Sequence, residues 1–438
     1  MPANLTRRQF AGSVAALAAF SALPRAAYAQ AALAPFEQRW PHLVALMQGY
    51  VGPGKVANMV AGLGWRTFEP DFFALGNTGF TSGVEADENT LYRIYSMTKP
   101  ITGMATMMCI EDGLLTLDTP IAEVIPGFAQ MQVQKVYDGP ITADNLEPAA
   151  RPVTVRHCLT HTAGLGYAIV QQGPIAQAYN DLGLSPGQVS RLELPGIFRA
   201  PAVRNLQTFA ERLATMPLVH QPGTRWSYSV GLDLMGAVIE KVSGKSFDAF
   251  LQERIFDPCS MTSTTFRVGA GDVPRFSTNY TIVDGTLVPI DLPESSVYLD
   301  EPAFPFGGAG LVSSTRDYDR FLTMLANGGE IDGRRVMAAA SVATGTSDLF
   351  PDTMAADGRF QFGTRTFGYG AGGLVGTGDA EGLYGWFGAA GTCGLVNMKL
   401  GLRHTLMTQY MPSQAYPLQN DFPVAVAADV AAAAGARG

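Results

Sequence analysis

Residues 95–112 carry the sequence YSMTKPITGMATMMCIED, which is almost entirely apolar after its first turn and predicts a buried helix. Pro100 is tolerated only in a first helical turn, where its missing N–H would have no partner, so the helix is expected to begin near Ser96. Ser96 and Lys99 then lie one turn apart on the same face, close enough for their side chains to meet. Because a lysine is rarely buried without a purpose, this spacing at a helix start predicts a chemical role for the pair.

A serine nucleophile needs a proton acceptor and a site that stabilises the negative oxygen of the intermediate. A lysine with an ordinary pKa of about 10.4 is a poor base at neutral pH, although burial can lower a lysine pKa by several units. Backbone N–H groups at a helix start suit a developing oxyanion. We therefore expect a second proton-transfer group close to Ser96 and Lys99.

Tyr228 is the candidate for that second group. It lies in PGTRWSYSVGLDLMGAVIEKVSG, residues 222–244, directly before a stretch whose apolar residues recur with helical spacing and which ends at Gly244. Taken alone, the tyrosine could equally be a side chain that packs against the start of that helix.

The sequence LYGWFGAAGT at residues 383–392 is the third candidate segment. Gly385, Gly388 and Gly391 interrupt a strand pattern, which indicates that another part of the chain approaches this backbone closely. An edge strand that turns the N–H of Ala389 towards the nucleophile would complete an oxyanion hole.

The order of the expected elements indicates a mixed fold of the α/β (α+β) class. Strand-like segments lie near both ends of the chain, and helical patterns dominate its middle. This order favours one antiparallel sheet built from both chain ends, flanked by helices, with an inserted all-helical lobe. The expected terminal helices span residues 35–50 and 423–436, the first strands 55–64 and 66–79, the sheet lobe about 35–95 and 305–438, and the helical lobe about 96–304.

Residues 1–29 are predicted to be an export signal and not part of the fold. Arg7 and Arg8 precede an apolar run at residues 11–23, which is followed by a small-x-small sequence, AYA. An apolar run of about 13 residues is too short for a bilayer that needs roughly 20, so no stable membrane insertion is expected. The paired arginines predict the twin-arginine route to the periplasm, and residues 30–438 then form the mature domain.

The composition excludes some classes of partner. A formal net charge of -8 argues against nucleic acid, because phosphate binding needs a basic surface. The five histidines show no metal-ligand spacing and no HExxH sequence occurs, so neither a metal nor another cofactor is expected. No cysteine belongs to a CxxC motif, and buried free thiols are favoured over disulfides at Cys109, Cys158, Cys259 and Cys393.

Taken in chain order, four segments resemble the serine β-lactamase and penicillin-recognising superfamily, most closely the class C β-lactamase-like esterases known as family VIII carboxylesterases. They are YSMTKPITGMATMMCIEDGLLTLDTPIAEVIPGF, VTVRHCLTHTAGLGY, PGTRWSYSVGLDLMGAVIEKVSG and GGAGLVSSTRDYDRFLTML. The resemblance covers nearly the whole mature chain and implies a β-lactamase/transpeptidase-like fold. It implies that Ser96 is the nucleophile, Lys99 the helper base and Tyr228 the general base or acid. The N–H groups of Ser96 and Ala389 would form the oxyanion hole.

Two departures from β-lactamases bear on the substrate. Val230 stands where their tyrosine motif has asparagine. In place of their Lys-Thr-Gly motif the chain has Trp386, Phe387 and Gly388, and family VIII carboxylesterases carry W-x-G there. The missing lysine helps to hold the carboxylate of a β-lactam or a D-peptide. The resemblance therefore implies a serine hydrolase that cleaves small, neutral carboxylic esters in a pocket at these three residues, through an acyl-enzyme on Ser96.

Other functions share the same three catalytic candidates. A transacylase, a D-amino-acid amidase or peptidase and a weak β-lactamase would all use this serine, lysine and tyrosine. A non-catalytic sensor is less favoured, because a binding module has no need of a buried lysine. The sequence predicts neither the natural ester nor the oligomeric state.

Two further motifs are not assigned to the site. GLSPG, residues 183–187, matches G-x-S-x-G around Ser185, but that motif needs a strand before it and a helix after it, and this one lies in a polar loop. His161 lies in an HTAG sequence that mimics a His-x-Gly third motif, yet it precedes Tyr228 in the chain. We expect His161 to be a hydrogen-bonded core histidine.

Overall fold

The computed structural model describes residues 34–192, 203–352, 354–362 and 365–435 of the 438-residue chain. The predicted export signal at residues 1–29 lies outside the described residues. Within the described ranges, no helix is both long and apolar enough to cross a membrane.

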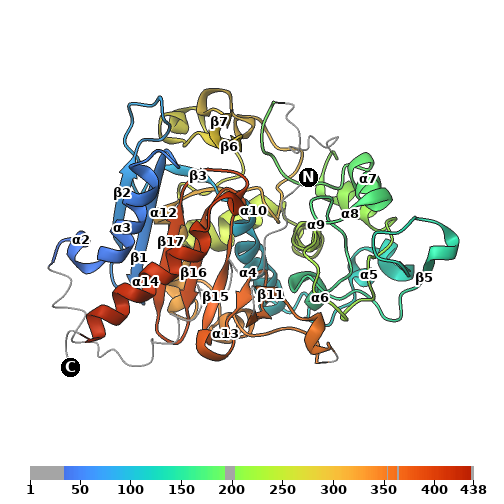
Figure 1. The fold of residues 1–438 in the computed structure, drawn as a ribbon. Coiled ribbons are helices and arrows are strands. Elements are labelled where there is room, and N and C mark those ends of the chain that lie inside the picture. Colours follow the sequence, from blue (N-terminus) through green and yellow to red (C-terminus); the bar gives the residue numbers. More distant parts are fainter. Residues whose placement is uncertain (1–33, 193–202, 353, 363–364, 436–438) are drawn as a thin grey trace.

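A seven-stranded antiparallel sheet joins both ends of the described chain, as the sequence predicted (Figure 1). In spatial order its strands are β13 (Gly368–Tyr369), β14 (Leu374–Val375), β15 (Leu383–Phe387), β16 (Cys393–Asn397), β17 (Leu402–Met407), β1 (Asn58–Trp65) and β2 (Asp71–Gly76). β17 pairs with β1, with Val60 opposite Met407 and Trp65 opposite Leu402. The two chain ends therefore meet inside the sheet and not at its edges.

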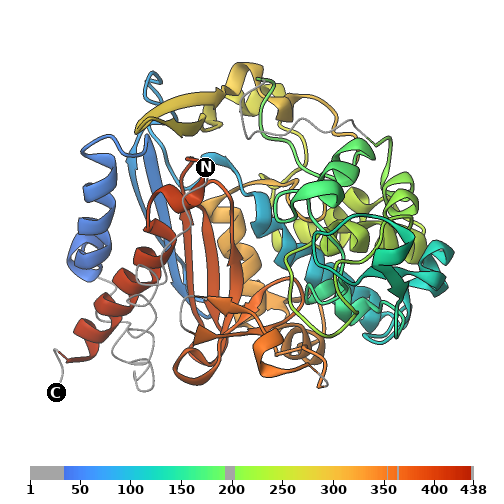
Figure 2. The ribbon, with the colours of Figure 1, turned by 45° about the vertical axis from the view of Figure 1, so that its right-hand side comes forward.

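The alternation of side chains along β1 explains how both faces of the sheet are covered. Met59, Ala61 and Leu63 belong to one hydrophobic core, to which the helices α3 (Pro41–Val51) and α14 (Leu418–Gly435) also contribute. Val60 belongs to the other core, and Gly62 lies against the helix α12 (Thr315–Ala326). Successive strand side chains point to opposite faces. α3 and α14 consequently cover one face and α12 the other (Figure 2).

The predicted helix at residues 35–50 is divided at Trp40 into α2 (Phe36–Arg39) and α3. Trp40 precedes Pro41, and a residue before proline is disfavoured in the helical conformation. Its φ of -130° and ψ of 52° accordingly lie outside the helical region. Pro41 then takes the first position of α3, where the missing N–H costs no hydrogen bond.

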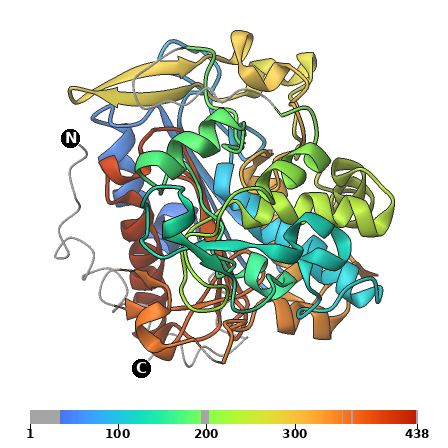
Figure 3. The ribbon, with the colours of Figure 1, turned by 90° about the vertical axis from the view of Figure 1, so that its right-hand side faces the viewer.

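The middle of the chain is mainly helical and faces the viewer in Figure 3. Its central helix is α4 (Thr98–Glu111), in which every residue from Thr98 to Cys109 is buried. The other helices of this region include α5 (Ile121–Val124), α6 (Val155–Leu159), α7 (Gly173–Asp181), α8 (Leu206–Leu213), α9 (Gly231–Ser243), α10 (Phe247–Leu251) and α11 (Asp257–Cys259). α13 (Ala339–Gly345) follows α12 in the chain and packs against α4.

Two short hairpins that the sequence analysis did not predict also lie in this middle region. They are β4 (Gln132–Gln134) with β5 (Leu146–Pro148), and β6 (Asn279–Val283) with β7 (Thr286–Asp291). The second hairpin lies at the top of Figure 3 and turns at Asp284 and Gly285, whose φ angles of 49° and 79° suit a two-residue turn. The four cysteines are buried free thiols, as predicted.

A buried ion pair fastens α12 to the sheet. Asp319 of α12 and Arg403 of β17 form two parallel bonds of 2.9 and 3.0 Å, and their side chains are 2% and 0% exposed. Arg403 also donates to the carbonyl groups of Arg66 and Phe68, so each of its three guanidinium nitrogens donates a hydrogen bond within the protein.

We predict that Asp319→Ala lowers the free energy of unfolding by about 3–5 kcal/mol, because it leaves a buried guanidinium without its counterion. Urea denaturation followed by circular dichroism measures this change. The matched control is Asp118→Ala, which breaks the surface pair with Arg156 and should change the same quantity by less than about 1 kcal/mol. Equal losses in the two variants would contradict the prediction.

Candidate active site

Ser96 lies in a strained turn between a strand and a helix. The strand β3 (Leu91–Arg93), which pairs with β8 (Val312–Ser314), leads into the 3-10 turn η2 (Tyr95–Met97) and then into α4. Tyr95 has a φ of 43°, in the left-handed region that residues other than glycine rarely occupy. Such a backbone conformation costs on the order of 1–3 kcal/mol and persists only where the surroundings fix it. Asn279 of β6 helps to fix Tyr95 by donating a hydrogen bond to its hydroxyl at 3.0 Å.

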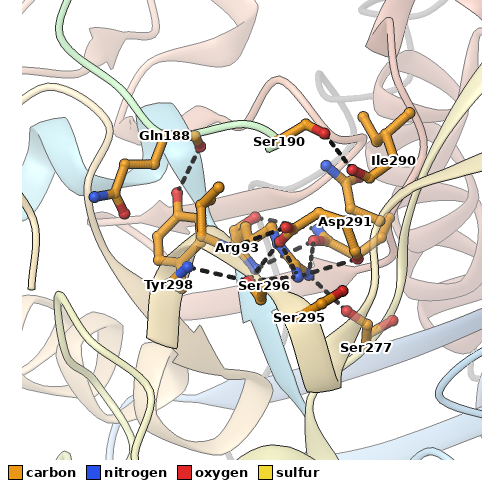
Figure 4. A network of polar contacts seen from close by, with 12 residues as sticks. Arg93, Gln188, Ser190, Ser277, Ile290, Asp291, Ser295, Ser296 and Tyr298 are labelled. Carbon is orange, nitrogen blue, oxygen red and sulfur yellow. Dashed lines mark hydrogen bonds and ion pairs between the residues drawn. The ribbon is translucent and has the colours of Figure 1, made fainter. Parts of the chain in front are cut away.

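A buried polar network fixes the chain three residues before Ser96 (Figure 4). Arg93, which is 0% exposed, donates to the Asp291 carboxylate at the end of β7 with its Nε at 2.8 Å. Its Nη1 donates to the carbonyl of Ser277 at 2.6 Å, and its Nη2 donates to the Ser296 hydroxyl. The hairpin β6–β7 and the segment after it thereby hold both residues that lead into the nucleophile turn, Arg93 and Tyr95.

The structure brings Ser96, Lys99 and Tyr228 together. The Tyr228 hydroxyl lies 2.7 Å from Ser96 Oγ, and Lys99 Nζ lies 3.3 Å from the same oxygen. Lys99 is 0% exposed and Ser96 is partly buried. A serine hydroxyl within reach of two proton-transfer groups is the arrangement that nucleophilic catalysis needs.

Lys99 has two further partners. Its Nζ donates to the carbonyl of Gly308 at 2.6 Å, and it lies 4.6 Å from the centre of the Tyr228 ring. A carbonyl oxygen and a ring face both interact favourably with a cation. The lysine is therefore buried with partners that suit its charged form.

Tyr228 lies where the two hydrophobic cores meet, since it packs against both. The rings of His161, Tyr167, Trp226 and Trp386 surround it, with centroids 4.8 to 6.1 Å from its own. The indole Nε1 of Trp386 donates to the Tyr228 hydroxyl over 3.4 Å. Aromatic side chains from both lobes thus hold the tyrosine against Ser96.

His161 is a buried, hydrogen-bonded side chain, as the sequence analysis expected. Its Nδ1 accepts the backbone N–H of Ser229 at 3.2 Å and contacts the Ser229 hydroxyl at 2.9 Å. Burial holds the pKa of His161 well below its usual range, and the charge of Lys99 lowers it further. It is therefore a neutral imidazole that supports the loop carrying Tyr228.

Ser185, the serine of the GLSPG sequence, lies in the loop after α7. Its hydroxyl donates to Asn180 Oδ1 at 2.7 Å. No strand precedes it in the described residues 173–192, so the strand–turn–helix context of the G-x-S-x-G motif is missing.

The segment after β15 lies directly against the nucleophile turn. β15 contacts η2, and a Cβ atom at Gly388 would overlap the Thr392 hydroxyl and come within 2.5 Å of the carbonyl oxygen of Ile94. Glycine is therefore required here for a close approach. The next residue, Ala389, has a backbone N–H without a hydrogen-bond partner in the described part of the chain, which leaves it available to an oxyanion.

The expectation that β15 is an edge strand needs a correction. β14 pairs with Tyr384 and Gly385, so the first part of β15 lies inside the sheet. β14 is only two residues long, however, and Trp386 and Phe387 pair with β16 alone. Among the described residues, β15 therefore lacks a second neighbouring strand at Trp386 and Phe387, which is the part that approaches Ser96. Trp386 is 8% exposed there, and Phe387 stacks on Phe362 with ring centroids 5.8 Å apart.

Asp233 and Gly308 belong to the site although the sequence analysis did not single them out. Gly308 contacts Lys99, and its N–H donates to Asp233. Both residues lie in segments that were quoted for the family resemblance, but nothing in their local sequence indicates that they meet. In the described ranges, no group of three or more histidine, cysteine, aspartate or glutamate side chains is arranged to hold a metal ion.

The chain was compared with protein families and with known proteins. The chain matches the Beta-lactamase family over residues 60–428. Protein Rv1367c of Mycobacterium tuberculosis (strain ATCC 25618 / H37Rv) is 34% identical over 278 residues, which is 64% of this chain, and the chain spans 64% of that relative's length. Esterase EstB of Burkholderia gladioli is 30% identical over 352 residues, which cover 73% of this chain and 78% of EstB.

The solved structure of EstCE1, described as a hydrolase with promiscuous acyltransferase activity, is similar with a TM-score of 0.70. The match covers 89% of this chain and 98% of EstCE1 at 22% sequence identity, a level at which the likeness concerns the fold. The predicted β-lactamase-like fold is confirmed.

We predict that a fluorophosphonate probe modifies Ser96 and that Gly388→Ala slows this labelling by about 10- to 100-fold, because a displacement of about 1 Å at a reacting centre can cost 100-fold. Peptide mass spectrometry over time measures the rate. Gly271→Ala, at an exposed glycine with no atom within 4 Å of the added Cβ, is the control and should react at the wild-type rate. Labelling of Ser185 instead, or equal rates in both variants, would contradict the assignment.

Proposed function

This chain belongs to the Beta-lactamase family, and we propose that it is a serine hydrolase that cleaves small, neutral carboxylic esters through an acyl-enzyme on Ser96. The observation that carries the proposal is the meeting of Tyr228 and Lys99 at Ser96 Oγ, at 2.7 and 3.3 Å. An esterase among the relatives with 30% identity, EstB, supports the reaction class.

The proposed reaction has two halves. Ser96 Oγ bonds to the ester carbonyl carbon while its proton passes to the Tyr228–Lys99 pair, and the carbonyl oxygen becomes an oxyanion between the N–H groups of Ser96 and Ala389. The bond to the leaving alcohol then breaks, and the alcohol oxygen takes the proton from the pair. Water attacks the resulting acyl-enzyme in the same manner, which releases the acid and returns the proton to Ser96.

The side chains around Tyr228 support a neutral, partly apolar substrate. Trp386 and Phe387 occupy the position of the lysine and threonine that precede the glycine in β-lactamases, and neither carries a charge for a substrate carboxylate. The rings of Tyr167 and Trp226 add apolar surface around Tyr228. A β-lactam and a D-peptide each carry a carboxylate that the missing lysine would help to hold, and we therefore rank a β-lactamase and a D-peptidase below an esterase.

Acyl transfer to an alcohol is the second candidate function. It uses the same acyl-enzyme and differs only in the acceptor, so Ser96, Lys99 and Tyr228 would serve it equally. The apolar rings around Tyr228 favour acyl transfer, because they let an alcohol compete with water for the acyl group. Product analysis with and without added alcohol separates the two.

We also propose that the chain acts in the periplasm after export. Arg7 and Arg8, followed by an apolar run and a small-x-small sequence, support a twin-arginine signal. The test of export is cell fractionation of an Arg7→Lys, Arg8→Lys double variant. We expect this variant to stay in the cytoplasmic fraction.

We predict that p-nitrophenyl butyrate is cleaved with a kcat/KM at least about 100-fold above that of a chromogenic cephalosporin, because neither Trp386 nor Phe387 offers the cephalosporin carboxylate a positive charge. Ser96→Ala should abolish both activities, and Ser185→Ala should keep the wild-type rate within a few-fold. Comparable kcat/KM values for the two substrates would overturn the proposed substrate class.

We predict that Lys99→Ala and Tyr228→Phe each lower kcat by about 10²- to 10⁴-fold, the usual loss when general acid–base help is removed. The double variant should be little worse than the poorer single variant, because residues that act as one unit are not additive. Steady-state kinetics on p-nitrophenyl butyrate measures all three. Tyr280→Phe is the control: its hydroxyl accepts the N–H of Phe80 away from Ser96, and kcat should be unchanged. Full activity in Tyr228→Phe would remove Tyr228 from the site.

A further inference from the structure

Asp233 is a buried carboxylate five residues after Tyr228 in the chain. It lies in the first turn of α9 and is 1% exposed. Its Oδ1 accepts the backbone N–H of Gly308 at 2.8 Å. A buried carboxylate is costly unless it is hydrogen-bonded and balanced by a cation, so its presence beside the site calls for a reason.

Gly308 connects Asp233 to Lys99. Its N–H donates to the aspartate, and its own carbonyl accepts Lys99 Nζ at 2.6 Å. A Cβ atom at Gly308 would overlap the Asp233 carboxylate, so only glycine fits. The preceding carbonyl, of Gly307, accepts the Thr102 hydroxyl of α4 at 2.6 Å. The two glycines are therefore clamped between α4, which carries the lysine, and α9, which carries the aspartate.

The charges around Lys99 are few. Burial raises the pKa of Asp233 to about 6, while the charge of Lys99 and the N–H of Gly308 oppose that rise and favour the ionised carboxylate. His161 faces Lys99 as a neutral imidazole, because burial lowers its pKa. Burial, together with the charge of Asp233, raises the pKa of the Tyr167 phenol well above its usual range, so that it stays neutral. In the described part of the chain, Tyr228 is the other titratable group in contact with the lysine.

We propose that Asp233 is a positioning residue for Lys99: through Gly308 it fixes the carbonyl that holds Nζ, and its negative charge keeps the lysine a cation during turnover. This inference rests on the proposed function. It assigns the proton of Ser96 to Tyr228: the Oγ–H bond breaks as the Oγ–carbon bond forms, the proton moves to the Tyr228 oxygen, and the leaving alcohol later receives it. Lys99 keeps its protons throughout and stabilises the charge on Tyr228.

The test is the pH profile of Asp233→Asn. The amide oxygen still accepts the Gly308 N–H, so the variant removes the charge and keeps the hydrogen bond. We expect kcat on p-nitrophenyl butyrate to fall about 10-fold. We also expect the acid-side midpoint of the kcat/KM profile to move down by about one pH unit, because loss of a nearby negative charge makes proton release from the Lys99–Tyr228 pair easier.

Thr102→Val is the matched control. It removes a neutral hydrogen bond to the neighbouring carbonyl of Gly307 with almost no change in shape. If Asp233 only fixed the glycines in place, Asp233→Asn, which keeps the hydrogen bond to Gly308, would retain the wild-type kcat and midpoint. Thr102→Val, which removes the bond to Gly307, would then be the variant that lowers kcat. We expect the control to lower thermal stability and to leave the midpoint and kcat within about two-fold of wild type.

Three results would overturn the proposal. The first is a kcat/KM profile of Asp233→Asn with the wild-type midpoint, and the second is a midpoint that moves equally in Thr102→Val. The third is a higher kcat in Asp233→Asn at neutral pH, which would mean that Lys99 acts as a neutral base. If Asp233→Asn does not fold, Asp233→Ser, which keeps a small acceptor, is judged by the same criteria. If neither folds, the carboxylate is a structural requirement and the proposal fails. Ser96→Ala, assayed in parallel, separates this failure from failure of the proposed function: an active Ser96→Ala enzyme would overturn the latter.

Discussion

Burying the ammonium group of Lys99 is the constraint on which the rest of this structure depends. Removing a cation from water costs several kcal/mol unless the protein supplies partners in its place. Lys99 gains the Gly308 carbonyl, the Tyr228 ring and the Ser96 hydroxyl, and these come from three different parts of the chain. The lysine can therefore be buried only when α4, the loop before α9 and the glycines before β8 are all in place, which links completion of the fold to assembly of the site.

The sheet and the helical region meet at the same place because the nucleophile turn belongs to both. β3 and η2 are tied by Arg93 and Tyr95 to the hairpin β6–β7, while α4 continues into the helical core. On the other side, Gly388 brings the end of β15 against the carbonyl of Ile94. A strained φ at Tyr95 is sustained because contacts on either side of Ser96 fix the backbone more firmly than the turn itself could. Strain of this kind is stored where a side chain must be held in one position.

Local signals in the sequence accounted for much of this arrangement. Pro100 located the start of α4, and strand patterns at both ends of the chain indicated the shared sheet. The break before Pro41 and the Asp284–Gly285 turn were also local signals, a residue before proline and a two-residue hairpin turn, and sequence reasoning passed over both. The contact of Asp233 with Gly308 is different in kind. It joins residues 75 positions apart through one backbone N–H, and no periodicity or composition reports such a pairing.

The balance of charge inside the site bears on what it can bind. In β-lactamases a further lysine beside the serine attracts a substrate carboxylate, whereas here Trp386 stands in that segment and its indole N–H points to Tyr228. The cation that contacts Ser96 is Lys99, and the buried carboxylate of Asp233 lies on the far side of Gly308 from it. The positive charge of Lys99 would thus already be balanced by Asp233. An anionic substrate would lose its hydration without gaining a counterion, which a desolvated carboxylate needs. A neutral ester gives up little hydration and still gains the aromatic walls. The charge balance around Lys99 and the aromatic rings around Tyr228 therefore both support the proposed neutral ester substrate.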